Sequence, residues 1–253
     1  MDNRYANICQ CINFNLQSNP KLIPNFFKAQ NFWYMDNEGL ILNRKYFALL
    51  ILVVPLLSLS SITLIIGDYE LFSAINLGLS NSIFDVLLSY IFPLLFFASY
   101  LITLLGLWKS HKKTNLELGV ISVVNGFISY GFGSLIKLAI QRPRPATLLQ
   151  YVRIIGPFET NSFSFPSTTT MLVFGFTIAF LLLYDEHHSV ITLTILSYLV
   201  AFAVIYTGFH FPTDVIGAIL FSIFIAVFTK KLVEYLFRYV IKLLKITIYS
   251  NIS

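Results

Sequence analysis

Long apolar runs separated by short polar segments cover most of this chain. Six of them reach or approach the roughly 20 residues that a membrane-spanning helix needs. These runs are Tyr46–Ile66, Asp85–Trp108, Leu116–Ile136, Thr168–Tyr184, Ser189–Tyr206 and Thr213–Phe228. The pattern predicts an all-α polytopic membrane protein whose six transmembrane helices form a bundle over residues 46–228.

The two ends of the chain lack such runs. Residues 1–45 are polar, Asn-rich and aromatic, and Asn25–Tyr34 fits either an interfacial helix or a loosely ordered tail. Residues 229–253 alternate apolar residues with Lys and Arg. That alternation fits a basic amphipathic helix on the cytoplasmic leaflet or a plain extension of the sixth run. We find no internal repeat and no segment typical of a separate soluble domain.

Composition supports the membrane assignment. The chain is 57% hydrophobic and only 11% charged, whereas a soluble domain carries about 25% charged residues. A net charge of +5 without a basic soluble module gives no reason to expect nucleic acid as a partner. The two cysteines, Cys9 and Cys11, are too few for a tetrahedral zinc site, and we expect no structural disulfide. The first residues lack a continuous apolar stretch, so we expect no cleaved signal peptide.

The basic residues predict an orientation. They gather in residues 1–45, in the loop after the second run (Lys109, Lys112, Lys113) and in the C-terminal tail, while the loop from Gly67 to Phe84 has none. Basic loops stay in the cytoplasm, so both termini are expected there. We expect a bacterial inner-membrane protein, with the loop after the first run facing the periplasm or a lumen.

A second set of polar residues lies on the predicted outer side. Arg142, Arg144 and Arg153 break the charge bias there, and Lys137, Ser167 and His210 fall at ends of apolar runs on the same side. These positions predict a phosphate site at the outer membrane–water interface, in contact with the lipid bilayer.

The residue types suit an anion. Lys137 supplies a point charge, Arg144 lies between two prolines, and Ser167 is a good N-cap whose following amides, beginning at Thr168, favour a negative group. Each also has a structural explanation. Lys137 can extend to the interface, the arginine can meet lipid headgroups, and Ser167 can simply cap its helix.

His210 and Asp214 make a phosphate reaction the better explanation. They stand four residues apart at the start of the sixth run, so the carboxylate can orient the imidazole and leave one ring nitrogen free to attack. Ionisable residues at membrane depth are costly and usually functional. The other histidines carry less: His187-His188 fits a solvated loop better than a metal site, and His111 lies among surface lysines.

These residues resemble the type 2 phosphatidic acid phosphatase superfamily, the lipid-phosphate phosphatases related to vanadium haloperoxidases. That family shows K-x6-R-P, then P-S-G-H, then S-R-x5-H-x3-D. The matching residues are Lys137, Arg144 and Pro145 in the first motif, Pro166 and Ser167 in the second, and His210 and Asp214 in the third. The resemblance covers about residues 71–228 and includes the six-helix layout.

The resemblance implies a role for each matching residue. His210 is expected to be the nucleophile that forms a phosphohistidine, with Asp214 as its orienting carboxylate. The phosphoryl oxygens are expected to be stabilised by Lys137, Arg144, Ser167 and a backbone amide near Thr168. The family uses no metal, so no metal or other cofactor is expected.

Two positions depart from the family pattern. Thr169 stands where the family has the histidine that protonates the leaving group, and Val204 stands where it has a phosphate-binding arginine. General acid catalysis contributes about 10²–10⁴-fold, so an ordinary alkyl phosphate is expected to be a poor substrate. A diphosphate expels a phosphate whose second pKa is about 6, and such a leaving group scarcely needs a proton. Tyr206 is a weak candidate for a replacement acid, because tyrosine has a pKa of about 10.

Two classes of function follow. The first is a lipid-phosphate phosphatase or phosphotransferase acting on a lipid phosphate or, better, a polyprenyl diphosphate. The alternative is a catalytically inactive relative that binds lipid phosphate or a partner protein, which Thr169 and Val204 favour. A transporter or channel is disfavoured by the absence of charged residues inside the first, fourth and fifth runs.

Overall fold

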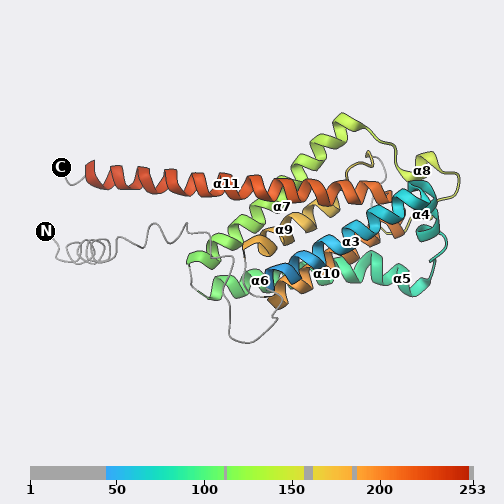
Figure 1. Ribbon diagram of the computed structural model, residues 1–253, viewed down its shortest axis with the longest axis horizontal. Helices are drawn as coiled ribbons and strands as arrows, with labels where there is room; N and C mark the ends of the chain where they lie inside the picture. Colours follow the sequence, from blue (N-terminus) through green and yellow to red (C-terminus); the bar gives the residue numbers. More distant parts are fainter. Residues whose placement is uncertain (1–43, 111–112, 157–161, 184–186, 251–253) are drawn as a thin grey trace. The chain divides into compact units, whose positions relative to one another are not determined.

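The computed structural model describes residues 44–110, 113–156, 162–183 and 187–250, which belong to one compact unit, Leu42–Ser253. Regular structure in these residues is entirely helical, as predicted (Figure 1). The elements are α3 (Arg44–Ile66), α4 (Asp68–Asn76), α5 (Ser82–Val86), the π-helical turn η1 (Leu87–Ile91), α6 (Phe92–Lys109), α7 (Lys113–Ile140), α8 (Pro145–Leu148), α9 (Thr168–Leu183), α10 (His187–Tyr206) and α11 (Pro212–Ser250). The predicted N-terminal segment, including Cys9, Cys11 and Asn25–Tyr34, lies outside the described residues.

Five helical segments are long and apolar enough to cross a membrane. They are Leu49–Ile66, Ser82–Lys109, Asn115–Leu148, Ser189–Tyr206 and Pro212–Leu232, and they correspond to five of the six predicted runs. The remaining run, predicted as Thr168–Tyr184, forms the shorter apolar helix Thr168–Leu181. The protein is therefore an integral membrane protein, while the count of six spans stays a prediction.

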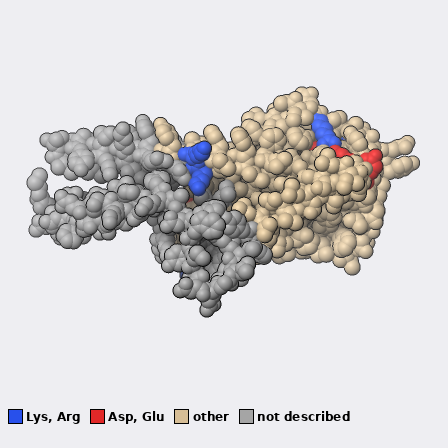
Figure 2. Space-filling view, in the orientation of Figure 1, with Lys and Arg blue, Asp and Glu red and all other residues tan. Residues whose placement is uncertain are grey.

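The surface is suited to lipid. Figure 2 shows the few charged side chains of one face in two places, with a broad uncharged surface between them. Large apolar side chains stand out from the bundle, among them Leu64 at 86% and Ile65 at 83% exposure. Apolar area of this extent is unfavourable in water and is compatible with hydrocarbon.

The shorter helix α9 lies in the centre of the bundle. It packs against α7, α10 and α11 (Figure 1), and its side chains at Val173, Phe174 and Phe180 are fully buried. A helix of 16 residues is about 24 Å long. Its neighbours surround it along most of that length, so its apolar side chains face protein rather than lipid.

Small residues let α7 and α9 approach closely. A Cβ added to Gly175 of α9 would lie 2.9 Å from the Cα of Gly126 in α7, and one added to Gly133 would lie 2.5 Å from the sulfur of Met171. Asn125 donates from Nδ2 to the carbonyl oxygen of Gly175 at 2.6 Å. Packing of small residues with a few interhelical hydrogen bonds is the usual way in which membrane helices associate. This packing brings the end of α7 and the start of α9 to the same end of the bundle.

The segment between the first two runs is more ordered than the sequence suggested. It was predicted as a loop, yet Asp68–Asn76 forms α4 directly after Gly67, which has φ 104°. Asn76 is buried and donates from Nδ2 to the carbonyl oxygens of Arg153 and Tyr206, both at 2.7 Å. An amide side chain bonded to distant backbone holds α4 onto the end of α10.

The last helix is long and continuous. α11 runs for 39 residues without a break, from Pro212 to Ser250. Residues 229–250 therefore continue the helix of the sixth run, which fits both alternatives, since an amphipathic helix can be continuous with a spanning one. Binding of this extension to the cytoplasmic leaflet remains a prediction.

Candidate phosphate site

A sharp turn after α7 sets the positions of the two predicted cations. Lys137 lies in the last turn of α7, and the amide of Gln141 still donates to its carbonyl oxygen at 3.0 Å. Gln141 itself has φ 52°, a left-handed conformation that reverses the chain. Pro143 and Pro145 then restrict the backbone on either side of Arg144.

Both cations point inward. Lys137 is 7% exposed and donates from Nζ to the carbonyl oxygen of Phe163 at 2.7 Å. Arg144 is 8% exposed and donates to Ser162 through Nε and Nη2, and from Nη1 to the carbonyl oxygen of Phe209 at 3.1 Å. The alternatives of a lysine extended to the interface and an arginine in the headgroup layer do not fit this burial. Each cation has N–H groups beyond those used in these bonds.

Ser167 caps α9 as predicted. Its Oγ accepts from the amide of Thr170 at 3.4 Å and from the hydroxyl of Thr170 at 3.0 Å. Both bonds use the oxygen as acceptor, which leaves the hydroxyl proton available to donate. The first-turn amides of Thr168 and Thr169 belong to the part of the helix that attracts anions.

A glycine turn delivers His210 to the same end of the bundle. Gly208 follows α10 with φ 90°, and an added Cβ would lie 2.5 Å from the carbonyl oxygen of Arg153. The amides of Phe209 and His210 both donate to the carbonyl oxygen of Val204 at 3.1 Å. The turn therefore ends α10, places His210 before α11, and accepts no side chain at Gly208.

The predicted His–Asp pair is present. Nδ1 of His210 lies 3.5 Å from Oδ2 of Asp214, which is longer than an ordinary hydrogen bond, and it makes no hydrogen bond to the described residues. His210 is 4% exposed. Burial lowers the pKa of His210 to about 4; Asp214 opposes this shift, while Lys137 and Arg144 add to it. The imidazole is therefore neutral at pH 7, the form that can attack phosphorus.

Asp214 is the most heavily bonded side chain of the site. It is fully buried, and its Oδ1 accepts from Arg142 at 2.7 Å. Its Oδ2 accepts from the hydroxyl of Ser164 and from the amide of Phe211, the latter at 2.8 Å. Its carbonyl oxygen accepts from the amide of Ser167 at 3.2 Å. The structure thus brings Asp214, the start of α9 and the loop after α7 together.

Sequence reasoning missed how three of these residues act. Arg142 was noted only as a cation on the outer side, and neither Ser164 nor Asp68 was given a role. Asp68 pairs with Arg142 at 2.6 Å. The one signal in the sequence was the break that Arg142 makes in the charge bias. Asp68 gave none, because an acidic residue at the end of an apolar run is common.

The two family positions that are substituted offer no acid or cation. Thr169 is exposed on the first turn of α9, and Val204 packs against the apolar core from α10. Tyr206 is not a replacement acid, because its side chain is fully buried and its hydroxyl donates to Asp85 at 2.6 Å. The cation of Arg153 lies 5.0 Å from the centre of the Tyr206 ring.

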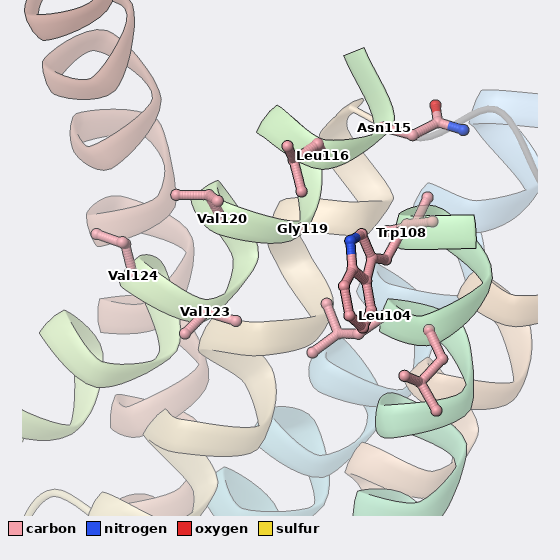
Figure 3. Close-up of a pocket in the computed structure, with 10 residues that line it drawn as sticks. Leu104, Trp108, Asn115, Leu116, Gly119, Val120, Val123 and Val124 are labelled. Atoms are coloured by element: carbon pink, nitrogen blue, oxygen red, sulfur yellow. The ribbon is translucent and has the colours of Figure 1, made fainter. Parts of the chain in front are cut away.

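The candidate site is distinct from a groove between α6 and α7. The groove has a volume of about 320 Å³, and Figure 3 shows Trp108 and Leu104 of α6 facing Gly119 and Val123 of α7. Val124, the last residue that lines it on α7, precedes Lys137 by thirteen residues, or about 20 Å along the helix. Its lining contains no charged side chain, so the groove offers no cation to hold a phosphate.

Metal ligands do not cluster in the part of the chain that the structure describes. His111 and the Asp185-Glu186 pair lie outside those residues. The expectation that the chemistry needs no metal or other cofactor stays a prediction.

Comparison with known proteins gives three similarities. Residues 116–238 match the model of the PAP2 superfamily. The chain is 31% identical over 164 residues to undecaprenyl-diphosphatase BcrC of Bacillus subtilis (strain 168), an alignment that covers 62% of this chain and 80% of that protein. Among solved structures it is similar to a PAP2 type phosphatidylglycerolphosphate phosphatase of Bacillus subtilis, with a TM-score of 0.51, 16% identity, and coverage of 76% of this chain and 96% of that one. It is also similar to LpxE of Aquifex aeolicus, with a TM-score of 0.49, 26% identity, and coverage of 65% and 94%.

Proposed function

Since this chain belongs to the PAP2 superfamily, we propose that it is a membrane phosphatase that hydrolyses a lipid diphosphate through His210. The matches confirm the resemblance to the family. The proposal is carried by one observation: the buried His210 lies beside Asp214 where the loop of Arg144 and the start of α9 meet.

The reaction follows from the groups present. Nε2 of His210 attacks the terminal phosphorus, an N–P bond forms, the bond from phosphorus to the bridging oxygen breaks, and the lipid monophosphate departs with that oxygen. Lys137, Arg144, the Ser167 hydroxyl and the Thr168 amide stabilise the negative charge on the phosphoryl oxygens. A water molecule then attacks phosphorus, the N–P bond breaks, and inorganic phosphate leaves with the protons shared between it and the solvent.

The leaving group decides the substrate class. With Thr169 in place of an acid, the departing oxygen receives no proton from this position. An alkoxide needs that proton, whereas a phosphate with a second pKa of about 6 leaves without it. The relative named as an undecaprenyl-diphosphatase supports a diphosphate on a polyprenyl chain.

Phosphate release by the purified protein tests the proposal. We expect a polyprenyl diphosphate to be hydrolysed at least about 10²-fold faster than the matching monophosphate, which is the lower end of what a general acid contributes. The His210→Ala variant should release no phosphate, and a labelled terminal phosphate that appears on a second lipid would identify a transferase. Equal rates on both lipids would contradict the diphosphate assignment.

A second function rests on the substituted positions. The exposed Thr169 and the core-packed Val204 leave the site without two groups of the family pattern. A protein that binds a lipid phosphate without cleaving it needs neither. If neither lipid is hydrolysed while vanadate still raises the melting temperature of the wild type, this binding function replaces the enzyme.

The orientation is part of the proposal. Both termini are assigned to the cytoplasm and His210 to the outer side by the distribution of basic residues. Ser82 and Ser110 are exposed at opposite ends of the apolar segment Ser82–Lys109. In a chain with Cys9 and Cys11 replaced by Ser, a cysteine at position 82 should react with an impermeant maleimide in intact cells, and one at 110 should not. The reverse pattern would place the site in the cytoplasm.

A further inference from the structure

Arg142 bridges two carboxylates that come from different helices. Its Nη1 lies 2.7 Å from Oδ1 of Asp214 in α11, and its Nη2 lies 2.6 Å from Oδ2 of Asp68 in α4. The guanidinium carbon lies 4.4 Å from the centre of the Phe211 ring. Asp68 precedes residues 116–238, so this bridge reaches beyond the part of the chain that the family model matches.

Thr213 closes the bridge into a ring. Its hydroxyl accepts from Nη1 of Arg142 at 2.6 Å and donates to Oδ2 of Asp68 at 2.6 Å. Its amide donates to Oδ1 of Asp68 at 2.9 Å. Asp68 therefore satisfies an amide in the first turn of α11 and holds Arg142 at the same time. The guanidinium cannot turn towards a phosphate without breaking contacts with both carboxylates.

Arg142 and Arg144 differ in this respect although only Pro143 separates them. Arg144 donates to the carbonyl oxygens of Ser162 and Phe209 and to the Ser162 hydroxyl. A neutral partner yields to an anionic phosphate more readily than a carboxylate does. Arg144 is thus suited to bind substrate, while Arg142 is suited to hold Asp214.

The charge and orientation of Asp214 depend on its ion pair with Arg142. Asp214 is fully buried, and a buried carboxylate without a cationic partner is costly and takes up a proton. Its Oδ2 is shared by Ser164, the Phe211 amide and, at 3.5 Å, His210. With Oδ1 fixed by Arg142, the plane of the carboxylate is set and Oδ2 is kept 3.5 Å from Nδ1 of His210.

The geometry points to Arg142, anchored by Asp68, as a positioning residue: it keeps Asp214 ionised and aimed so that His210 carries its proton on Nδ1 and presents Nε2 to phosphorus. Arg142 acts through Asp214 and does not touch the phosphate. The catalytic half of this inference rests on the proposed function; the state of the His210 ring does not.

Steady-state kinetics on the polyprenyl diphosphate test the catalytic half. Arg142→Gln should lower kcat by about 10²-fold, the cost of a misplaced reacting group, with KM within about threefold of the wild type. Arg144→Gln, the matched control two residues away, removes a group that contacts the phosphate, so its cost should persist in an Asp214→Asn background. In an Asp214→Asn background Arg142→Gln should cost less than about twofold, because its effect has already been lost.

If Arg142→Gln does not fold, the variants Asp68→Asn and Arg142→Lys test the same positioning role. The amide of Asp68→Asn can still accept from Thr213, and we expect a fall in kcat of about tenfold that is also absent beside Asp214→Asn. Arg142→Lys keeps the charge but reaches one carboxylate, so it should recover part of kcat. A cost that persists undiminished in the Asp214→Asn background overturns the inference.

The ring of His210 supplies a readout that needs no turnover. In protein with His111, His187 and His188 changed to Gln, ¹⁵N NMR of labelled histidine should show one neutral tautomer, protonated on Nδ1. Arg142→Gln and Asp214→Asn should both give a mixture of tautomers, and Arg144→Gln should not. If the wild type hydrolyses neither lipid but this pattern appears, the proposed function fails and the positioning role stands. A single tautomer in Arg142→Gln overturns the role, whether or not the protein is active.

Discussion

The two sides of the candidate site differ sharply in how they are built. On the side of the nucleophile, His210 and Asp214 are buried, and Asp214 is bonded to Arg142, Ser164 and the Phe211 amide. On the other side, at the two positions that depart from the family pattern, Thr169 is exposed and Val204 packs against the apolar core. The proposed reaction therefore has its attacking group and lacks two groups of the family pattern, an acid and a phosphate-binding cation. A substrate with a good leaving group needs only the first side.

The largest change is expected when the second side is rebuilt. Thr169→His with Val204→Arg restores an acid and a cation, so turnover of a lipid monophosphate should rise by about 10²–10⁴-fold, the contribution of a general acid. Turnover of the diphosphate should rise far less, because its leaving group already departs unaided. Thr169→Gln with Val204→Leu is the matched control and should change neither rate.

A gain of equal size on both lipids would mean that the substitutions improve binding rather than proton transfer. No gain on either lipid would mean that position 169, on the first turn of α9, lies out of reach of the leaving oxygen. In both cases the contrast between the two sides would no longer explain the choice of substrate.

The sequence predicted the placement of His210, Asp214 and Ser167 because the signals for it are local. His210 and Asp214 are four residues apart at a helix start, and Ser167 caps a helix in the ordinary way. The apolar runs predicted the helices, and α9 covers Thr168–Leu183 of the run predicted as Thr168–Tyr184. What could not be predicted is long-range: Asp68 reaches Arg142 across 74 residues, and only folding decides which of two nearby arginines meets a carboxylate. The orientation of Tyr206 towards Asp85 is another contact of this kind.

The cations of the site provide the next test of the comparison. Arg144 is held by neutral groups and should turn its free N–H groups to an oxyanion. Arg144→Ala should therefore weaken vanadate binding by about 10²–10³-fold, the effect of losing one strong donor to a phosphoryl-like anion. The rise in melting temperature with vanadate measures this loss, and Lys231→Gln, at an exposed position further along α11, should keep the full rise.

The outcome separates a phosphate site from a structural arginine. A structural role alone predicts a lower melting temperature without vanadate and an unchanged rise with it. If the rise survives in Arg144→Ala, the anion binds elsewhere and the nucleophile side has no cation for the phosphate.

The smallest expected effect concerns pH. Attack requires the neutral imidazole, and burial lowers the pKa of His210 to about 4. Activity should therefore be retained as the pH falls below the ordinary histidine pKa of 6.5 and be lost only as it passes through about 4. At pH 5 a group with a pKa of 4 is roughly 30-fold more populated in its neutral form than one with a pKa of 6.5. The acidic side of the kcat/KM profile for the diphosphate measures this pKa, and the ring titration of labelled His210 measures the same pKa without substrate.

Folding stability should also fall on acidification. Between pH 6.5 and 4 the unfolded chain binds a proton at His210 that the folded chain does not bind, so the free energy of unfolding decreases across that window as the pH falls. If the activity profile and the ring titration both give a pKa near 6.5, His210 is open to water. The nucleophile side would then lack the burial that distinguishes it from the side of Thr169.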